Sequence, residues 1–188
     1  MVNRTCILLI IFSVLGITGC TSTTSQSVQD VHTSSRNREL ANQLTQQAIE
    51  FISIDTEQAK KVLRQALDAD LYHGPAHNNL GVVLLNQGRL YEAAEEFDWA
   101  RRLMPGHPDP RINLGVALER GGKVDDALEA YASAIEVYPG HLSAIQALAQ
   151  LQIRAGIQDE YTDELLKEIV YRGDSKWSDW AKSQLKRD

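Results

Sequence analysis

The chain has 188 residues, which suits one domain of ordinary size. Its 25 acidic residues outnumber 19 basic ones, and the net charge is −6. This balance argues against a nucleic-acid partner, because a protein that neutralises phosphates needs a basic surface. Two cysteines are too few for a disulfide scaffold or a four-cysteine zinc site. The composition therefore favours an acidic, mostly helical domain.

Residues 1–19 differ from the rest of the chain. Arg4 is their only charged residue, and residues 7–17 form an apolar run that is too short to span a bilayer as a helix. The length of the run is typical of a secretory signal peptide. We therefore expect residues 1–19 to be a signal peptide.

The segment ends in Ile17, Thr18, Gly19 and Cys20, which resembles the lipobox of bacterial lipoproteins. The resemblance implies cleavage before Cys20, lipidation of Cys20, and a chain held at a membrane of the bacterial cell envelope by its acyl chains. Thr21 resembles the residue that directs such lipoproteins to the outer membrane, where the domain would face the periplasm. The alternative is an ordinary signal peptide or an uncleaved anchor with an incidental cysteine.

Residues 20–37 are predicted to be a flexible tether that begins at the lipidated cysteine. Nine of residues 21–37 are Ser or Thr, and only Val28 and Val31 are apolar. Such a segment cannot bury enough apolar surface to offset the entropy lost on ordering.

The remaining sequence repeats itself with a period of 34 residues. The first copy contains Leu80, Gly81, Leu84, Gly88, Ala93, Phe97, Ala100 and Pro105, and the second contains Leu114, Gly115, Leu118, Gly122, Ala127, Tyr131, Ala134 and Pro139. This spacing and these residue types resemble the tetratricopeptide repeat, a helix–turn–helix unit. The resemblance implies an all-α fold, a right-handed α-α superhelix of about four helix pairs with a C-terminal capping helix.

The repeat phase also sets the expected boundaries. A repeat domain is predicted over 38–174, with clear repeats at 74–107 and 108–141 and degenerate ones at 40–73 and 142–175. A capping helix is predicted over 175–188, where Trp177 and Trp180 share one face. Those tryptophans could instead insert into a membrane interface, but the end of a repeat array more often needs a cap.

Each repeated residue type has a packing role. Gly81 and Gly115 are predicted where the first helix of each pair crosses the second, and Gly88, Gly122 and Gly156 where a first helix ends in a left-handed residue. The sequence departs from the family at His77 and Arg111, which occupy the position of its first-helix tryptophan. This departure leaves open how the mouth of each helix pair is packed.

The exposed side of the first helices is the predicted partner-binding face, and the resemblance implies that it is concave. Its residues are Asn78, Asn79, Val82, Leu85, Asn86, Ile112, Asn113, Val116, Glu119, Arg120, Gln146 and Gln150, together with Ile153 and Arg154. Asn79 and Asn113 share a repeat position and resemble the asparagine ladder of the O-linked N-acetylglucosamine transferase, which implies that they bind a peptide main chain. Alternatively, these amides bond only to neighbouring helices.

Other functions receive less support from the residues. The two-carboxylate clamp of chaperone-binding repeats is absent, so chaperone tails are poor candidates. His73, His107 and His141 recur at the repeat period, but successive repeats stack too far apart for them to share a metal ion, and they are expected in the turns before the first helices. Acidic stretches such as Tyr91–Glu96 and Asp125–Glu129 are typical of solvated helix faces.

The sequence therefore predicts a membrane-anchored scaffold that binds a protein or peptide partner and needs no cofactor or metal. Its work would be the assembly or recruitment of envelope complexes. The competing hypothesis is an envelope hydrolase with an unrecognised site in the cleft, although no catalytic motif was found. Neither the oligomeric state nor the partner can be read from the sequence.

Overall fold

The structure is a computed structural model that describes residues 36–186. These residues form α-helices and no strand. The helices are α2 (Arg38–Phe51), α3 (Thr56–Ala69), α4 (Gly74–Asn86), α5 (Leu90–Leu103), α6 (Asp109–Arg120), α7 (Val124–Val137), α8 (Leu142–Arg154), α9 (Glu160–Arg172) and α10 (Ser175–Leu185). The expectations for residues 1–35, including the signal peptide, Cys20 and most of the tether, lie outside the described residues.

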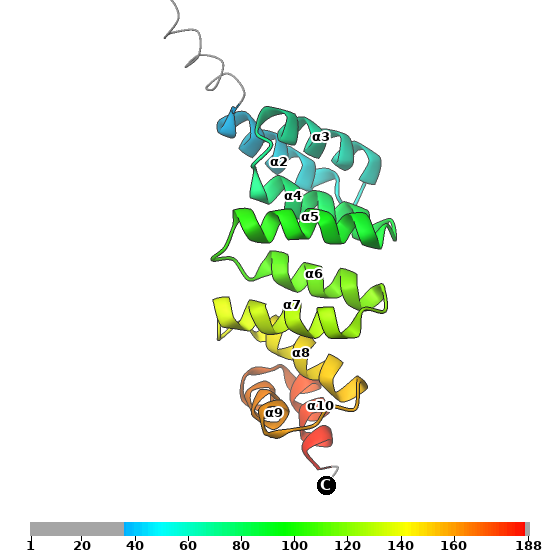
Figure 1. Cartoon of the computed structure of the whole chain (residues 1–188), viewed down its shortest axis with the longest axis vertical. Helices are drawn as coiled ribbons and strands as arrows, with labels where there is room; N and C mark the ends of the chain where they lie inside the picture. The colour runs from blue at the N-terminus through cyan, green and yellow to red at the C-terminus, as the bar shows by residue number, and fades with distance from the viewer. Residues whose placement is uncertain (1–35, 187–188) are drawn as a thin grey trace, which may run out of the picture. The chain divides into compact units, whose positions relative to one another are not determined.

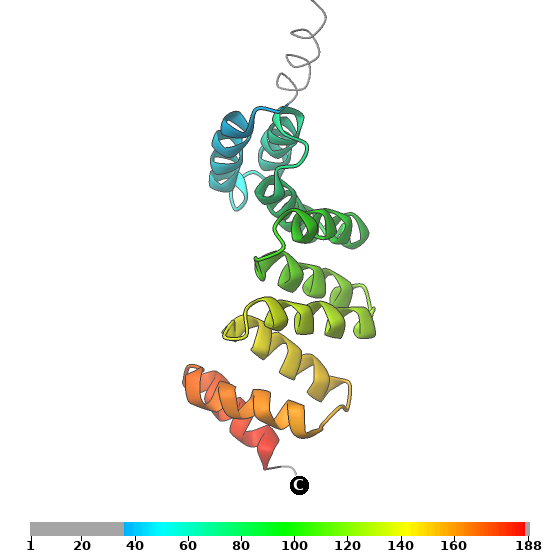
Figure 2. The ribbon, with the colours of Figure 1, turned by 60° about the vertical axis from the view of Figure 1, so that its left-hand side comes forward.

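The helices form four antiparallel pairs that pack one after another along the chain (Figures 1 and 2). The pairs are α2–α3, α4–α5, α6–α7 and α8–α9, and α10 packs against α9. Among the first helices, α2 also contacts α4, and α4 contacts α6. We call the exposed side of α2, α4, α6 and α8 the first-helix face, and the exposed side of α3, α5, α7 and α9 the second-helix face. The predicted all-α repeat solenoid with a C-terminal helix is confirmed.

Local sequence accounts for the turns between paired helices. Gly88, Gly122 and Gly156 have φ angles of 74°, 76° and 73°, which lie in the left-handed region and end α4, α6 and α8 as predicted. The first pair has no such glycine. There, Asp55 caps α3 by accepting a hydrogen bond from the backbone N–H of Gln58 at 3.0 Å.

In each of the two central pairs, a glycine of the first helix packs directly beneath an aromatic ring of the second helix. A Cβ atom built on Gly81 would lie 2.6 Å from Cε1 of Phe97, and one built on Gly115 would lie 2.5 Å from Cε1 of Tyr131. Phe97 and Tyr131 are themselves buried, so neither ring can move into solvent. The 34-residue register therefore places the same crossing in both repeats.

His77, at the position of the family's first-helix tryptophan, packs against the second helix of its pair. Its ring stacks on Trp99 of α5 at a centroid distance of 5.8 Å. Its Nδ1 is 2.6 Å from the carboxylate of Glu96, and its Nε2 is 2.9 Å from the carbonyl oxygen of Leu71. In the next repeat, Arg111 donates from Nε to the hydroxyl of Ser133 at 3.0 Å. In these two pairs, the side chain at this position therefore makes a polar contact to the second helix.

The chain is fixed to the domain before α2 begins. The backbone N–H of Asn37 donates to the carbonyl of Ala69 at 2.7 Å, and Nε of Arg36 donates to the carboxylate of Asp70 at 2.9 Å. Asp70 is fully buried. These two residues were predicted to belong to the tether of 20–37, but they are bonded to the end of α3.

The hydrophobic core divides into two clusters. One extends from Ala48 to Ala117 and the other from Ala127 to Ala181, and Val116 of α6 packs against both. Trp177 and Trp180 pack against the second cluster, with their rings edge to face at 5.4 Å. This packing supports the capping role of α10. The boundary between the clusters falls along α6.

The glycine crossing can be tested with Gly81→Ala and Gly115→Ala. Each adds only a Cβ, which the aromatic ring above it cannot accommodate without a shift, and overpacking of this kind costs about 1–3 kcal/mol of unfolding free energy. Chemical denaturation measures the loss. Gly106→Ala is the matched control, since its Cβ meets nothing within 4 Å. Equal stability of all three variants would contradict the crossing.

A second prediction concerns His77. Burial lowers its pKa, but the hydrogen bonds to Glu96 and Leu71 outweigh burial, and the net pKa is raised from its usual value. Protonated His77 therefore stabilises the folded state fully below the unfolded-state pKa of about 6.5. This stabilisation is lost as the pH rises through the raised pKa of the folded state. The difference in unfolding free energy between the wild type and His77→Gln should therefore shrink as the pH rises above about 6.5. A difference that stays constant or grows would contradict the assignment.

Candidate functional site

The first-helix face carries most of the predicted binding residues with accessible side chains. Asn78, Asn79, Val82, Ile112, Asn113, Val116, Glu119, Gln146 and Gln150 are half-buried, and Asn86 and Arg120 are exposed. Leu85 is an exception, because it is only 8% exposed and packs in the first core cluster. Leu85 therefore supports α4 from inside and does not belong to the accessible face.

A cavity of about 420 Å³ lies on this face between α2 and α4. Asn79 and Pro75 of α4 line one side, and the other side comes from α2. The α2 residues are Asn42, Gln43, Thr45, Gln46 and Ile49. None of the lining side chains is a carboxylate, an ammonium or a guanidinium. The cavity thus presents amides and one exposed isoleucine.

His73, which precedes α4, also lines this cavity. It is 5% exposed, and its Nε2 is buried without a hydrogen-bond partner among residues 36–186. Burial lowers the pKa of His73, so the imidazole is neutral at pH 7. His73 lies in the turn before α4, as predicted, and its side chain makes no capping hydrogen bond to that helix. An unpaired buried nitrogen is costly unless a ligand group satisfies it.

The two asparagines of the predicted ladder differ in their contacts. Nδ2 of Asn113 donates to Oδ1 of Asn78 at 3.0 Å, which links α6 to α4. The side chain of Asn79 makes no hydrogen bond within the described part of the chain. One amide donor of Asn113 therefore bonds to a neighbouring helix, as the alternative prediction had it. The amide of Asn79 keeps both donors and its acceptor for a partner.

An ion pair occupies the first-helix face between α6 and α8. Glu119 pairs with Arg154 and also accepts a hydrogen bond from the hydroxyl of Tyr131 at 2.9 Å. Burial, reinforced by the Glu119 carboxylate, raises the pKa of Tyr131 and keeps it protonated at neutral pH. Arg154 and Glu119 therefore satisfy each other, whereas the amides of Gln146 and Gln150 on α8 make no side-chain hydrogen bond within the described residues.

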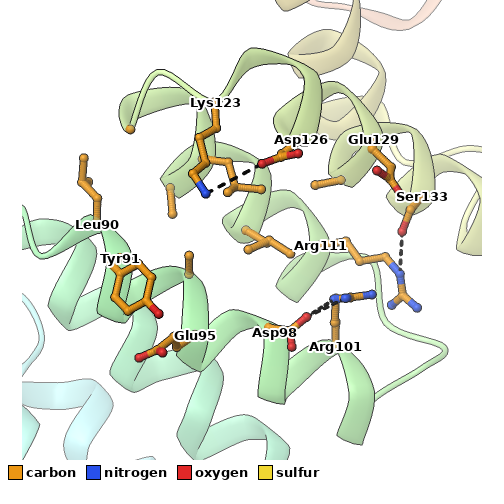
Figure 3. Close-up of a pocket in the computed structure, with 16 residues that line it drawn as sticks. Leu90, Tyr91, Glu95, Asp98, Arg101, Arg111, Lys123, Asp126, Glu129 and Ser133 are labelled. Carbon is orange, nitrogen blue, oxygen red and sulfur yellow. Dashed lines mark hydrogen bonds and ion pairs between the residues drawn. The ribbon is translucent and has the colours of Figure 1, made fainter.

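A larger cavity, of about 600 Å³, lies on the second-helix face between α5, α6 and α7 (Figure 3). One side of α6 lines this cavity through Arg111, Leu114 and Leu118, which follow one another at helical spacing. Asn113 lies on the opposite side of the helix. The rim of the cavity includes Tyr91, Glu95, Asp126 and Glu129. These residues were predicted to lie on solvated helix faces, and a cavity between them was not anticipated.

The described residues offer neither a metal site nor a membrane span. Within 36–186, no three His, Cys, Asp or Glu side chains gather closely enough to hold a metal ion. Every helix in this range falls short of the length and apolarity that a bilayer crossing requires. The candidate sites are therefore the two cavities and the amides around the smaller one.

Stacked helix pairs with a 34-residue period define a helical-repeat protein. The tetratricopeptide repeat family matches the chain at residues 55–108, 92–142 and 112–160. These matches together span 55–160, more than half of the chain. The chain therefore belongs to the tetratricopeptide repeat family. A search of curated proteins found no match.

Solved structures share the fold at low sequence identity. The first tetratricopeptide domain of human RPAP3 is 16% identical, with a TM-score of 0.61 over 64% of this chain and 95% of that one. The first tetratricopeptide domain of Spaghetti (RPAP3), solved with a bound HSP90 peptide, has a TM-score of 0.62, 16% identity and coverage of 65% of this chain and 98% of that one. MamA from Desulfovibrio magneticus RS-1 is 20% identical, with a TM-score of 0.61 and 77% of each chain covered.

A mutant O-GlcNAc transferase of Thermobaculum terrenum is also similar. It is 20% identical, with a TM-score of 0.63 over 75% of this chain but only 26% of the transferase. The likeness is therefore to a part of that enzyme. At identities of this size, the comparisons show a common fold.

Proposed function

We propose that this protein is a membrane-anchored interaction scaffold that binds an extended segment of a partner protein on its first-helix face. The observation that carries the proposal is the amide-lined cavity between α2 and α4, where Asn79 and Nε2 of His73 have no hydrogen-bond partner among residues 36–186. An extended peptide offers backbone N–H and carbonyl groups at regular spacing, which such groups can satisfy.

The charge distribution favours a neutral segment at this end of the face. No ionised side chain lines the cavity between α2 and α4, and the ion pair of Glu119 with Arg154 farther along the same face is internally satisfied. A charged partner side chain in the cavity would lose hydration without gaining a counter-ion. Ile49, which is 44% exposed, adds an apolar contact.

The structure of the RPAP3 domain with an HSP90 peptide supports a peptide as the kind of ligand. HSP90 itself is a poor candidate here, because the clamp residues for a chaperone tail are absent from this sequence. The partner is therefore expected to be bound through its main chain and a few neutral or apolar side chains.

The location in the cell envelope rests on the sequence. The lipobox-like residues 17–20 support lipidation of Cys20, and the Ser- and Thr-rich residues that follow give the domain reach from the membrane. Thr21 supports the outer membrane, with the domain in the periplasm. In this position the scaffold would recruit or assemble envelope proteins.

Asn79→Ala tests the binding face. Once crosslinking in cells has identified a partner, calorimetry should show affinity weakened by about tenfold, because the partner's backbone group is left unpaired. The melting temperature should not change, since Asn79 makes no hydrogen bond within the domain. Gln47→Ala, an exposed change on α2 outside the cavity, is the control. Unchanged affinity for Asn79→Ala would rule out this part of the face.

Cys20→Ser tests the anchor. The variant should incorporate no labelled fatty acid and should fractionate with the soluble proteins, because the acidic domain has little electrostatic attraction to anionic lipids. Cys6→Ser is the matched control and should remain lipidated. Labelling that persists in Cys20→Ser would show that another residue carries the lipid.

A further inference from the structure

The cavity on the second-helix face has an apolar floor that spans both core clusters. Its floor residues are Leu90, Ala94, Leu114, Ala117, Leu118 and Ala130. Leu90, Ala94, Leu114 and Ala117 belong to or pack against the first cluster, whereas Leu118 packs against the second. Small side chains at Ala94, Ala117 and Ala130 leave the space between α5 and α7 open. Leu128, one repeat after Ala94, shows that a larger side chain fits the equivalent position.

Two guanidinium groups, those of Arg101 and Arg111, lie at one end of the cavity, where Asp98 is the carboxylate that forms an ion pair (Figure 3). Asp98 pairs with both Arg101 and Arg102, at 2.6 Å in each case. Arg111 lines the same end, and no carboxylate lies within ion-pair distance of it among the described residues. Its bonds go to neutral oxygens, from Nε to Ser133 at 3.0 Å and from Nη1 to the carbonyl of His107 at 3.1 Å.

Two effects leave the charge of Arg111 poorly compensated. Burial lowers its pKa and the neighbouring Arg101 lowers it further, whereas the carboxylate of Glu136, which makes no ion pair with Arg111, offsets only part of this shift. A partly desolvated cation without a counter-ion costs free energy that an anionic ligand would recover. Only two of the five guanidinium N–H groups are used, so a carboxylate can bind to the others. The apolar floor and the unpaired guanidinium therefore select for one ligand chemistry.

We propose that this cavity binds a second partner peptide, an extended apolar segment with one acidic side chain at the Arg111 end. The distance from Tyr91 to Arg101 along α5 is ten helical residues, or about 15 Å, which corresponds to four or five extended residues. Glu95 lines the cavity from α5, and Glu129 lies on α7 one turn before Ser133 (Figure 3), so both repel any acidic side chain that does not bind Arg111 directly. The segment is therefore apolar with a single acid, and not polyacidic.

This site is independent of the first-helix face. The cavity and the amides of α2 and α4 lie on opposite sides of the helix stack, because Arg111, Leu114 and Leu118 are on the side of α6 that faces away from Asn113. Two partner segments can then be bound at once. A scaffold with two chemically different faces holds a neutral segment and an acidic, apolar one close to each other.

The test is selection of a random seven-residue peptide display library on the full-length protein. Selected peptides are then measured for affinity against Arg111→Gln, Ala94→Leu, Arg102→Gln and Asn79→Ala. We expect a group with one acid beside apolar residues that loses roughly tenfold or more in affinity with Arg111→Gln, as for a charged hydrogen bond. Ala94→Leu should weaken the same group by filling the floor.

The remaining variants are the controls. Arg102→Gln removes the same charge from an exposed side chain outside the cavity, and Asn79→Ala alters only the other face, so neither should affect this group. Melting curves check the folding of Arg111→Gln, and Ala94→Leu provides a second test with Arg111 intact. The proposal is overturned if no selected peptide is sensitive to Ala94→Leu and Arg111→Gln, or if the sensitive peptides lack an acid.

Discussion

The close approach of two helices at a glycine beneath an aromatic ring is the constraint on which the rest of the structure depends. Gly81 beneath Phe97 and Gly115 beneath Tyr131 let the backbones of each pair come together where any side chain would collide with a buried ring. The same crossing one repeat later gives α4 and α6 matching orientations. Both faces of the helix stack inherit their regular arrangement of side chains from this contact.

The two faces then differ because the polar residues on them have different partners. On the first-helix face, neutral amides surround the smaller cavity, and the ion pair of Glu119 with Arg154 is satisfied within the protein. On the second-helix face, charged side chains surround the apolar floor of the larger cavity. The guanidinium of Arg111 there bonds to neutral oxygens. A single helix, α6, supplies residues to both faces. The chemical difference arises within one repeated framework.

The features that could be predicted from the sequence are those fixed by the repeat period. The crossing glycines and the left-handed Gly88, Gly122 and Gly156 recur at 34 residues, so each copy supports the other. The contribution of Asn42, Gln46 and Ile49 was missed, because the degenerate first repeat lacks the residues that set the register. The bond of Asn113 to Asn78 and the burial of Leu85 depend on how successive first helices stack. The second-helix cavity was missed because its rim has the ordinary pattern of a solvated face.

The division of the core along α6 has a consequence for how the domain unfolds. In a repeat protein, stability is the sum of each unit and its contacts with the next, and few residues connect distant units. Among the described residues, Val116 of α6 packs against both core clusters. The two halves of the domain are therefore weakly coupled at α6. Amide hydrogen exchange should then occur in two blocks with different opening free energies. A molecule that bridges α5 and α7 would join the two blocks. Binding on one face would then make the whole repeat array unfold more cooperatively, and the two opening free energies would become equal.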